Sequence, residues 1–540
     1  MHPGTRLLTL LSVAGSLYLM LMLLHPVALC ADTLEVCKGN CRYQTISAAL
    51  WDVEPGDLVW VRAGEYDENG PVRLKSDVTI RGEDPAHPER TTIRVSAGHA
   101  VVGTGVHLTS TCILEGFTII AGEGRGIYIQ NGATEIIRNN IIRGCASDYQ
   151  GAAIRIDNEG TAPTIINNTF IDNYSTYQGG AIYIEDASPR IVGNQFINNR
   201  SERNGGAISA RTLEGPGQAP VIEGNVFIGN TAAGTGGAVY LEQSKASLSN
   251  NRFESNMAAV GGAICVQAAN PLAPAMLCNN YFSANTTYSL AANQVGGAIA
   301  VRGQANVLLN GNWISDNRAG TGGGIYIEGS IAEVTNNYLL YNRSSQLTLR
   351  SCSPLVVNNS MLGEHITGNI GIQVLDLSSP FIANNIVMRE TIGLSSESSS
   401  TPILAHNNTV NNGQDYMGAI VDEMDLHQDP RFADLSNNDL HLMPGSRLID
   451  AGTQDNAPLT DYDGDLRPQD GDGDGHARPD VGADEFSPPT PTPSPTPTRT
   501  PSATASPTAS LTASPTASLT PTPTMTLMGC RIHLPVVWKG

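Results

Sequence analysis

Short runs of apolar residues alternate with polar ones, with a period of two, along most of the chain. Ile182 and Ile184 flank Tyr183, and Val239 and Leu241 flank a tyrosine in the same way. This alternation predicts short strands that bury one face. The runs are separated by Gly and Asn, which tolerate the left-handed backbone of a tight corner. Helical repeats are not expected here, because the 3.6-residue period is missing.

The runs recur as one repeated unit. Each copy has a strand that begins Gly-Gly-Ala-Ile or similar, a short second strand, and an Asn before a third strand. The Asn recurs every 22 to 32 residues, at Asn140, Asn168, Asn194, Asn225, Asn251, Asn280, Asn312, Asn337, Asn359, Asn385 and Asn408. A period of this size predicts a solenoid, in which neighbouring coils bury each other's apolar side. Stacked Asn residues at one corner predict an amide ladder.

This repeat resembles the right-handed parallel β-helix of the pectate-lyase-like superfamily, over roughly residues 43–432. The resemblance implies an all-β fold, a solenoid of three-stranded coils. Residues 126–424 should form about ten to twelve coils, and at about 4.8 Å per coil the rod would be roughly 50–60 Å long. The fold hosts lyases, hydrolases, epimerases and adhesins, so it does not predict one activity.

Residues 32–125 are expected to form an N-terminal cap and the first, less regular coils. Ile46, Ala49, Leu50 and Val53 share one face of a predicted short helix. The resemblance implies that this helix covers the open first coil. An uncovered strand edge would otherwise pair with another chain.

Residues 425–486 differ from the repeats. The stretch DPRFADLSNNDLHLMPGSRLIDAG begins at Asp429, and the stretch DYDGDLRPQDGDGDGHARPDVGADEF begins at Asp461. Both closely resemble the domain that ends many bacterial surface β-helix proteins, often catalogued as a choice-of-anchor type. The resemblance implies a C-terminal cap and display at the cell surface, and it implies no reaction.

This region also contains a candidate calcium loop. Asp470, Asp472 and Asp474 alternate and a glycine follows, as in the first half of an EF-hand loop. The second half departs from that pattern, because Val481 stands in place of the bidentate Glu, and Asp480 or Asp484 could substitute for it. The alternative to a structural Ca²⁺ site is an acidic, solvated loop. No other cofactor is expected.

Both ends of the chain have features of an exported protein. Residues 1–31 read as a signal peptide, with a long apolar run before small residues. Residues 487–526 are nearly all Pro, Thr, Ser and Ala, which predicts a disordered, extended stalk. Residues 527–540 form an apolar tag that is too short to cross a membrane. We expect a secreted or cell-surface protein that meets the membrane only through its signal or anchor.

Charge and cysteine content narrow the expected partners and compartment. The formal net charge is −20, which argues against nucleic-acid binding. Cys37 and Cys41 are close enough in sequence to form a small disulfide loop in an oxidising compartment. We expect most of the others to be buried, apolar side chains, namely Cys112, Cys145, Cys265, Cys278 and Cys352.

The Gly-Gly strand offers the most informative outer face. If its isoleucines point inward, then Tyr183, Tyr240 and Tyr326 point outward in one row with Arg155. Tyrosines beside charged groups are suited to binding a sugar chain by stacking and hydrogen bonding. The alternative is a solvated sheet face on which opposite charges neutralise each other along the stack.

Asp157, Glu185 and Glu242 align on the same face near Arg211, where they could act as acid, base or metal ligands. The match to β-helix enzymes is poor, because Lys245 is the only lysine in the coils and no dense acidic cluster occurs there. We therefore expect a non-catalytic binding, adhesive or structural role, with a polysaccharide or cell-surface partner. The alternative is a polysaccharide lyase or glycoside hydrolase acting on this outer face.

Overall fold

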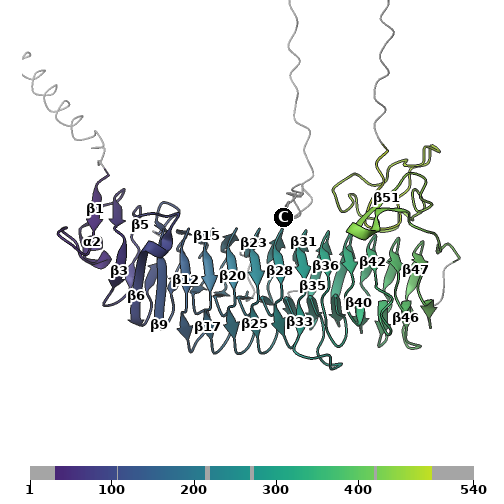
Figure 1. Ribbon diagram of the computed structural model, residues 1–540, viewed down its shortest axis with the longest axis horizontal. Coiled ribbons are helices and arrows are strands. Elements are labelled where there is room, and N and C mark those ends of the chain that lie inside the picture. The colour runs from purple at the N-terminus through teal and green to yellow at the C-terminus, as the bar shows by residue number, and fades with distance from the viewer. Residues whose placement is uncertain (1–30, 106–107, 213–218, 268–272, 419–422, 489–540) are drawn as a thin grey trace, which may run out of the picture.

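The computed structural model describes residues 31–105, 108–212, 219–267, 273–418 and 423–488. Its backbone forms a rod of stacked coils, purple at the N-terminal end and yellow-green at the other (Figure 1). The signal peptide, the stalk and the terminal tag expected from the sequence lie almost wholly outside the described residues. Within those ranges, no helix has the length and apolar character needed to span a membrane.

The coils build three parallel sheets, as the alternating pattern predicted. Sheet A has fifteen strands and sheet C has fourteen, so the rod makes about fourteen turns. Eleven strands of sheet A lie in the repeat region, within the ten to twelve coils expected there. Sheet B begins with single strands. Its strand β9 then pairs with both β12 and β13, so that the sheet continues as two ladders.

Sheet A consists of β1 (Thr33–Val36), β2 (Leu58–Val61), β5 (Thr79–Gly82), β8 (Ile113–Glu115), β11 (Ile136–Arg138), β15 (Thr164–Ile166), β19 (Arg190–Val192), β23 (Val221–Glu223), β27 (Ser247–Ser249), β31 (Ala275–Cys278), β35 (Asn306–Asn310), β38 (Ile331–Thr335), β41 (Leu355–Val357), β44 (Phe381–Ala383) and β47 (Ile403–Ala405). Sheet C consists of β4 (Val72–Arg73), β7 (Val101–Thr104), β10 (Ile127–Gln130), β14 (Ile154–Asp157), β18 (Ile182–Glu185), β22 (Ile208–Arg211), β26 (Val239–Glu242), β30 (Ile264–Gln267), β34 (Ile299–Arg302), β37 (Ile325–Glu328), β40 (Ser345–Arg350), β43 (Ile370–Leu375), β46 (Ile392–Ser396) and β49 (Gln414–Met417). The longer ladder of sheet B consists of β3 (Gly64–Asp67), β6 (Thr91–Ala97), β9 (Thr118–Glu123), β12 (Ile141–Arg143), β16 (Thr169–Ile171), β20 (Gln195–Ile197), β24 (Val226–Ile228), β28 (Arg252–Glu254), β32 (Tyr281–Ser283), β36 (Trp313–Ser315), β39 (Tyr338–Leu340), β42 (Ser360–Leu362), β45 (Ile386–Met388) and β48 (Asn408–Val410). Its shorter ladder consists of β13 (Ala146–Ser147), β17 (Tyr174–Ser175), β21 (Arg200–Ser201), β25 (Thr231–Ala232), β29 (Met257–Ala258) and β33 (Thr286–Thr287).

The core consists of inward side chains stacked coil on coil. The middle residues of five successive sheet B strands form a stack of parallel rings, with centroids 4.7–4.8 Å apart and planes 5–7° apart: Phe170, Phe196, Phe227, Phe253 and Phe282. This spacing agrees with the expected rise of each coil. The rings exclude water from the interior and give each coil apolar neighbours above and below.

An amide ladder follows the corner between sheets A and B, as predicted from Asn140 to Asn385. Each Asn donates from Nδ2 to the Oδ1 of the next, over 2.9–3.1 Å. The last member is Asn407, so the prediction of Asn408 was wrong by one residue. The ladder residue lies two positions after the end of the sheet A strand, and Asn408 instead begins β48 and bonds Gln428.

A second ladder follows sheet B at the next corner. Its Nδ2–Oδ1 distances are 2.9–3.0 Å along Asn173, Asn199, Asn230, Asn256, Asn285, Asn317 and Asn342. Asn342 then donates to Gln346 Oε1 over 2.7 Å, and Gln346 donates to Glu390 Oε1 over 2.6 Å. This second ladder was not predicted from the sequence, although its Asn residues recur with the same period as those of the first.

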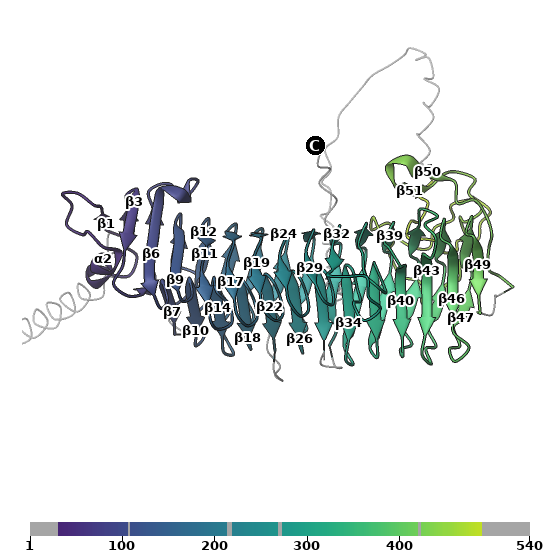
Figure 2. The same ribbon diagram turned by 60° about the horizontal axis from the view of Figure 1, so that its bottom comes forward.

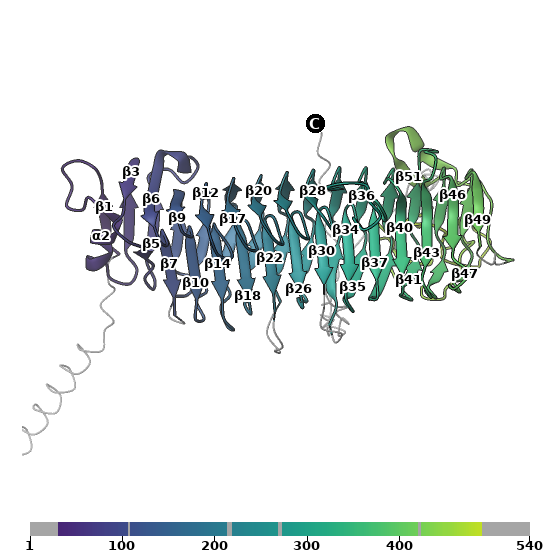
Figure 3. The same ribbon diagram turned by 90° about the horizontal axis from the view of Figure 1, so that it is seen from below.

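The predicted N-terminal helix is present as α2 (Ile46–Asp52), at the purple end beside β1 (Figure 1, Figure 3). All four residues predicted on its apolar face are buried. Thr45 accepts a hydrogen bond from the Ala48 N–H over 3.2 Å, and Glu68 accepts one from the Ile46 N–H over 2.7 Å. These acceptors satisfy N–H groups that the first turn of a helix leaves without partners.

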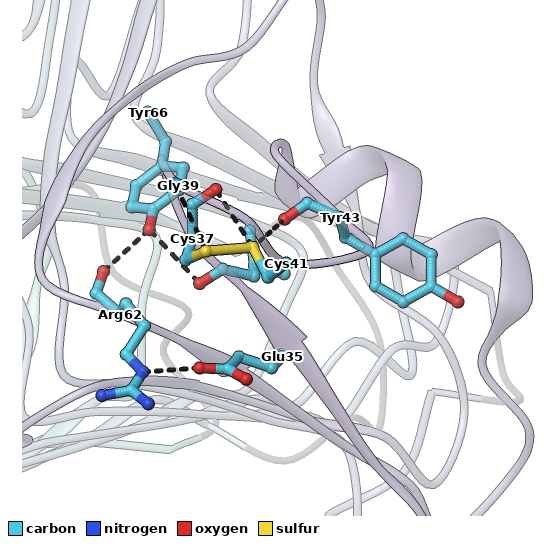
Figure 4. Close-up of a disulfide and its surroundings, with 8 residues drawn as sticks. Glu35, Cys37, Gly39, Cys41, Tyr43, Arg62 and Tyr66 are labelled. Atoms are coloured by element: carbon cyan, nitrogen blue, oxygen red, sulfur yellow. Dashed lines mark hydrogen bonds and ion pairs between the residues drawn. A yellow bond between two sulfur atoms is a disulfide. The ribbon is translucent and has the colours of Figure 1, made fainter.

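The predicted disulfide joins Cys37 and Cys41 beside the end of β1 (Figure 4). Nearby, Arg62 Nε donates to Glu35 Oε1 over 2.6 Å, and the Tyr66 hydroxyl donates to the Arg62 carbonyl over 2.9 Å. These contacts join β1, from which the disulfide loop begins, to the first coils. The five remaining described cysteines are buried, as expected, namely Cys112, Cys145, Cys265, Cys278 and Cys352.

Residues 429–487, named here the flank unit, do not cap the end of the rod as predicted. The unit contains β50 (Phe432–Asp434), the 3-10 helix η2 (Leu435–Asn437) and β51 (Asp439–Leu442). It lies along the side of the last coils, over β39, β42 and β45 (Figure 1, Figure 2). Residues before it still belong to the last coil, where Leu426 pairs with Asn408.

Outward residues of sheet B explain where the flank unit docks. In earlier coils these positions hold polar or part-exposed residues, but in β39, β42 and β45 they hold Leu340, Leu362 and Met388. These side chains form one buried cluster with Leu440 and Ala483 of the flank unit. The last coils thus offer an apolar outer face, and the flank unit buries it.

Candidate functional site

The outer face of sheet C, which runs along the rod (Figure 3), has the residue rows that the sequence predicted. Strand pairing places Arg155 beside Tyr183 and Asp157 beside Glu185. The first row is Tyr128, Arg155, Tyr183, Ser209, Tyr240, Cys265, Ala300 and Tyr326. The second row includes Gln130, Asp157, Glu185, Arg211, Glu242, Gln267 and Arg302.

The expected exposure of this face was wrong for the tyrosines. Tyr183, Tyr240 and Tyr326 are only 2%, 3% and 2% exposed. The chain before each Gly-Gly pair crosses over the face. Gly179 has a φ of 66°, and a Cβ there would lie 2.3 Å from the Ile182 carbonyl oxygen, so a side chain does not fit. Burial raises the pKa of Tyr183 to about 12. Rings enclosed in this way cannot stack on a sugar.

Each predicted catalytic carboxylate on this face is paired with an arginine. Arg155 donates from Nε to Asp157 Oδ2 over 2.6 Å and from Nη2 to Glu185 Oε2 over 3.1 Å. Arg211 Nε lies 3.9 Å from Glu242 Oε2. The structure therefore groups Arg155, Asp157 and Glu185 in one cluster and leaves Arg211 and Glu242 as a separate pair. This arrangement matches the charge neutralisation that was the alternative to a sugar-binding face.

An exposed group of side chains, not predicted from the sequence, lies at the edge of this face. Tyr149 and Tyr177 are 64% and 40% exposed. Arg125 lies 5.4 Å from the ring centroid of Tyr149, and Arg203 lies 4.0 Å from that of Tyr177. We name these four residues the tyrosine platform. Cation–π contact holds each guanidinium against a ring and keeps the other parts of the rings open to solvent.

A repeated local turn places both platform tyrosines. Ser147 and Ser175 pair in register at the end of β13 and β17. Each serine Oγ accepts a hydrogen bond from the N–H of the tyrosine two residues on, over 3.2 Å for Tyr149 and 3.1 Å for Tyr177. The two rings therefore occupy the same position in adjacent coils. The repeated sequence Ser-x-Tyr-Gln-Gly was the signal that could have revealed them.

Gln150 connects the platform to the buried charged cluster. Its side-chain oxygen accepts a bond from Arg155 Nη1 over 2.8 Å, and its backbone oxygen accepts one from Arg125 Nε over 3.0 Å. Below it, the Tyr128 hydroxyl donates to Asp157 Oδ2 over 3.0 Å. Burial, and after it the neighbouring Arg155 charge, lowers the pKa of Arg125. The platform thus rests on fixed hydrogen bonds and has a positive character.

A hollow of about 470 Å³ lies elsewhere, over sheet A near the N-terminal end. Trp60 lines it, together with two arginines that both bond the buried carboxylate of Glu115, Arg81 and Arg138. Arg62 covers the Trp60 ring at 4.4 Å. Because Glu115 already pairs with both arginines, this hollow is a weaker binding candidate than the tyrosine platform.

The predicted calcium loop is only partly assembled as expected. Carboxylate oxygens of Asp470 and Asp472 come within 4.8 Å of each other and of Asp450, which was not predicted. Asp474 is not part of that group, and its Oδ1 accepts a bond from the His476 N–H over 2.7 Å. The oxygen donors present suit a hard cation such as Ca²⁺.

Asp480, which the sequence offered as a calcium ligand, is used inside the flank unit instead. It is buried and accepts bonds from the N–H groups of Asp450 and Phe486, both over 2.7 Å. Burial raises its pKa to about 8. Asp484 is also buried and accepts a bond from the Leu442 N–H over 2.7 Å. These carboxylates replace the backbone partners that a regular sheet would supply.

A family model for the right-handed β-helix region matches residues 104–287 and 275–427, so the chain belongs to that family. No curated protein sequence matches the chain.

Several solved structures are similar in fold. The A-module of the Azotobacter vinelandii mannuronan C-5 epimerase AlgE6 is 15% identical, with a TM-score of 0.33, over 71% of this chain and 92% of that one. Pectate lyase Pel9A is 13% identical, with a TM-score of 0.28, over 85% and 98%. A PL6 alginate lyase in complex with a trisaccharide is 13% identical, with a TM-score of 0.34, over 73% and 86%. These similarities do not indicate what this chain binds or catalyses.

Proposed function

We propose that the chain is an exported, non-catalytic β-helix protein that binds a carbohydrate through its tyrosine platform. The observation that carries the proposal is the pair of exposed rings, Tyr149 and Tyr177, at one position of adjacent coils. A tyrosine ring offers an apolar face to the C–H surface of a sugar and a hydroxyl for hydrogen bonding. Arg125 and Arg203 add fixed donors for sugar hydroxyl or carboxylate groups.

The charged cluster beneath the platform supports binding rather than cleavage. Asp157 and Glu185 are both held by Arg155, so neither is poised to exchange a proton with a bound sugar. One observation favours the lyase or hydrolase alternative. Asp157 Oδ1 is buried and has no hydrogen-bond partner among the described residues. An oxygen of this kind close to a binding surface would be the first place to look for chemistry.

Export and surface display are part of the same proposal. The Cys37–Cys41 disulfide supports an oxidising compartment, where such bonds persist. The likeness of residues 425–486 to choice-of-anchor domains, together with the Pro/Thr-rich residues 487–526, supports attachment at a cell surface. On this view the rod is held away from the surface, and the flank unit lies between it and the stalk. A structural Ca²⁺ in the flank unit would use Asp470 and Asp472, with Asp450 as the third carboxylate.

The test is a panel of purified polysaccharides, read for both retention of the full chain and change in polymer length. We expect retention by at least one polysaccharide with no shortened or unsaturated product. Products would instead establish the lyase or hydrolase alternative and direct attention to Asp157. If neither retention nor products appear, the proposal fails and a structural or protein-adhesive role is the remaining account.

A further inference from the structure

A group of possible metal ligands meets where the flank unit docks on the rod. His441 lies on β51, and Asp463 and Asp484 lie on later loops of the unit. Ligand atoms of all three come within 4.8 Å of one another. His441 Nε2 lies 2.9 Å from Asp463 Oδ2. Because these residues are far apart in sequence, they can form such a group only when the unit is folded.

The other imidazole nitrogen of His441 is held by a further carboxylate, Asp439, at 2.5 Å from Nδ1. A carboxylate that accepts the Nδ1 proton fixes the ring orientation and leaves Nε2 directed at the group. This orientation is the one usual for histidines that bind a metal ion, since the second ring nitrogen of such a histidine almost always has a hydrogen-bond partner.

A buried hydroxyl of the rod belongs to a residue packed beside this group and has no hydrogen-bond partner of its own. Tyr338, on β39, is 3% exposed, and among the described residues its hydroxyl oxygen makes no hydrogen bond. Its ring contacts the residues that precede the two carboxylates in sequence, with Tyr462 at a centroid distance of 4.4 Å and Ala483 in the same cluster. Burial, and after it the charges of Asp484 and Asp463, raises the pKa of this hydroxyl.

We propose that His441, Asp463 and Asp484 bind one divalent transition-metal ion at this junction, with the Tyr338 hydroxyl as the fourth ligand. The ion would bond to both the flank unit and the rod and would hold them together. It would also supply the partner that the buried hydroxyl lacks. A buried, unpaired hydroxyl has a free-energy cost that coordination removes. The proposal does not depend on carbohydrate binding.

The ligand types favour Zn²⁺ over Ca²⁺. One imidazole with three oxygen atoms is a four-ligand set that suits Zn²⁺. Ca²⁺ takes six to eight oxygen ligands and would bind preferentially to the group that has oxygen ligands only, at Asp450, Asp470 and Asp472. The two acidic groups of the flank unit should therefore discriminate between the two ions.

Calorimetric titration of the chelator-treated full chain with Zn²⁺, in excess Ca²⁺, tests this assignment. We expect one tightly bound Zn²⁺ per chain and a raised melting temperature. His441→Asn should weaken binding by about 10-fold or more, and Asp439→Asn, which frees the ring, by about 10-fold to 100-fold. Asp470→Asn is the matched control, since it changes only the other acidic group, and should leave Zn²⁺ affinity unchanged.

Tyr338→Phe distinguishes the loss of a metal ligand from the loss of folding, because it keeps the packed ring and removes only the hydroxyl. We expect weaker Zn²⁺ binding and, in the absence of metal, a melting temperature that is not lowered, because the variant removes a buried hydroxyl that has no partner. The proposal is overturned if the wild-type chain does not bind Zn²⁺. It is also overturned if the affinity survives both His441→Asn and Tyr338→Phe, because the ion would then be held elsewhere on the chain.

Discussion

Glu135 and Glu390 are carboxylic acids enclosed in the rod. Both are fully buried. Neither oxygen of Glu135 has a hydrogen-bond partner among the described residues, and Glu390 has one, from Gln346. Burial raises the pKa of each to about 7, from an ordinary value of 4.5. The folded rod therefore keeps both protons at a pH where the unfolded chain has lost them.

This difference predicts how Glu135 changes stability with pH. Below pH 4.5 the folded and the unfolded chain both hold this proton, so ionisation of Glu135 does not yet reduce the free energy of unfolding. As pH rises toward 7 only the unfolded state releases the proton, so the free energy of unfolding falls, by about 3 kcal/mol in all. We expect Glu135→Gln to remove this loss and to be more stable than wild type at pH 8. Denaturant unfolding of the wild-type and variant chains from pH 5 to 8 measures this difference in the free energy of unfolding.

The control for that experiment is Glu333→Gln, which changes an exposed carboxylate on β38. Its free energy of unfolding should follow the wild-type pH profile. A Glu135→Gln profile parallel to wild type would show that the carboxyl is not the source of the pH dependence.

The sequence identified which side chains of sheet C point inward and which point outward, but not how exposed the outward side chains are. The row containing Tyr183 was predicted correctly, because side chains alternate along a strand. The burial of Tyr183 was not predicted, because the segment that covers it comes from the chain before the glycine pair. Tyr149 and Tyr177 were missed for the same reason. They lie in that segment, in turns where alternation does not apply.

At the scale of elements, the repeat predicted most of the architecture. The three sheets, the number of coils and ten of the eleven proposed ladder residues follow from one repeated pattern. Asn408 failed because the corner accepts whichever residue lies two positions after the strand, and that is Asn407. The docking site of the flank unit was not predicted, although the outward residues of β39, β42 and β45 change from polar to apolar.

That change predicts what a charge would do on the docking face. Leu362 is buried beneath the flank unit, whereas Ile228, at the same register position of an earlier coil, is 37% exposed. We expect Leu362→Asp to destabilise docking by roughly 2–4 kcal/mol, because it buries an unpaired carboxylate. Hydrogen exchange should then lose protection at flank-unit amides such as that of Leu442.

Ile228→Asp is the matched control, since the next coil naturally has Glu254 at that position. It should leave exchange in the flank unit unchanged. Equal protection in the Leu362→Asp chain would contradict the account of how the unit is held.

At the scale of the whole molecule, the parts occupy different regions of the rod. The tyrosine platform lies on the coils of β13 and β17, and the flank unit covers the coils of β39 to β45 (Figure 1). A ligand on the platform would therefore meet the rod away from the flank unit. The sequence could not place the flank unit on the side of the rod. The motifs of the unit are local in sequence, whereas its position depends on apolar residues about 50 to 140 positions earlier in the chain.

Binding through the tyrosine platform is the central claim, and one measurement tests it directly. Affinity for the retained polysaccharide should be compared between the wild-type chain, the Tyr149→Ala/Tyr177→Ala double variant and Tyr281→Ala. Tyr281 is the control, because it is 37% exposed beside Arg252 but lies on sheet B. We predict at least about a tenfold loss in the double variant, equal to about 1.4 kcal/mol, and none in the control. Undiminished affinity in the double variant, with its melting temperature unchanged, would contradict the account.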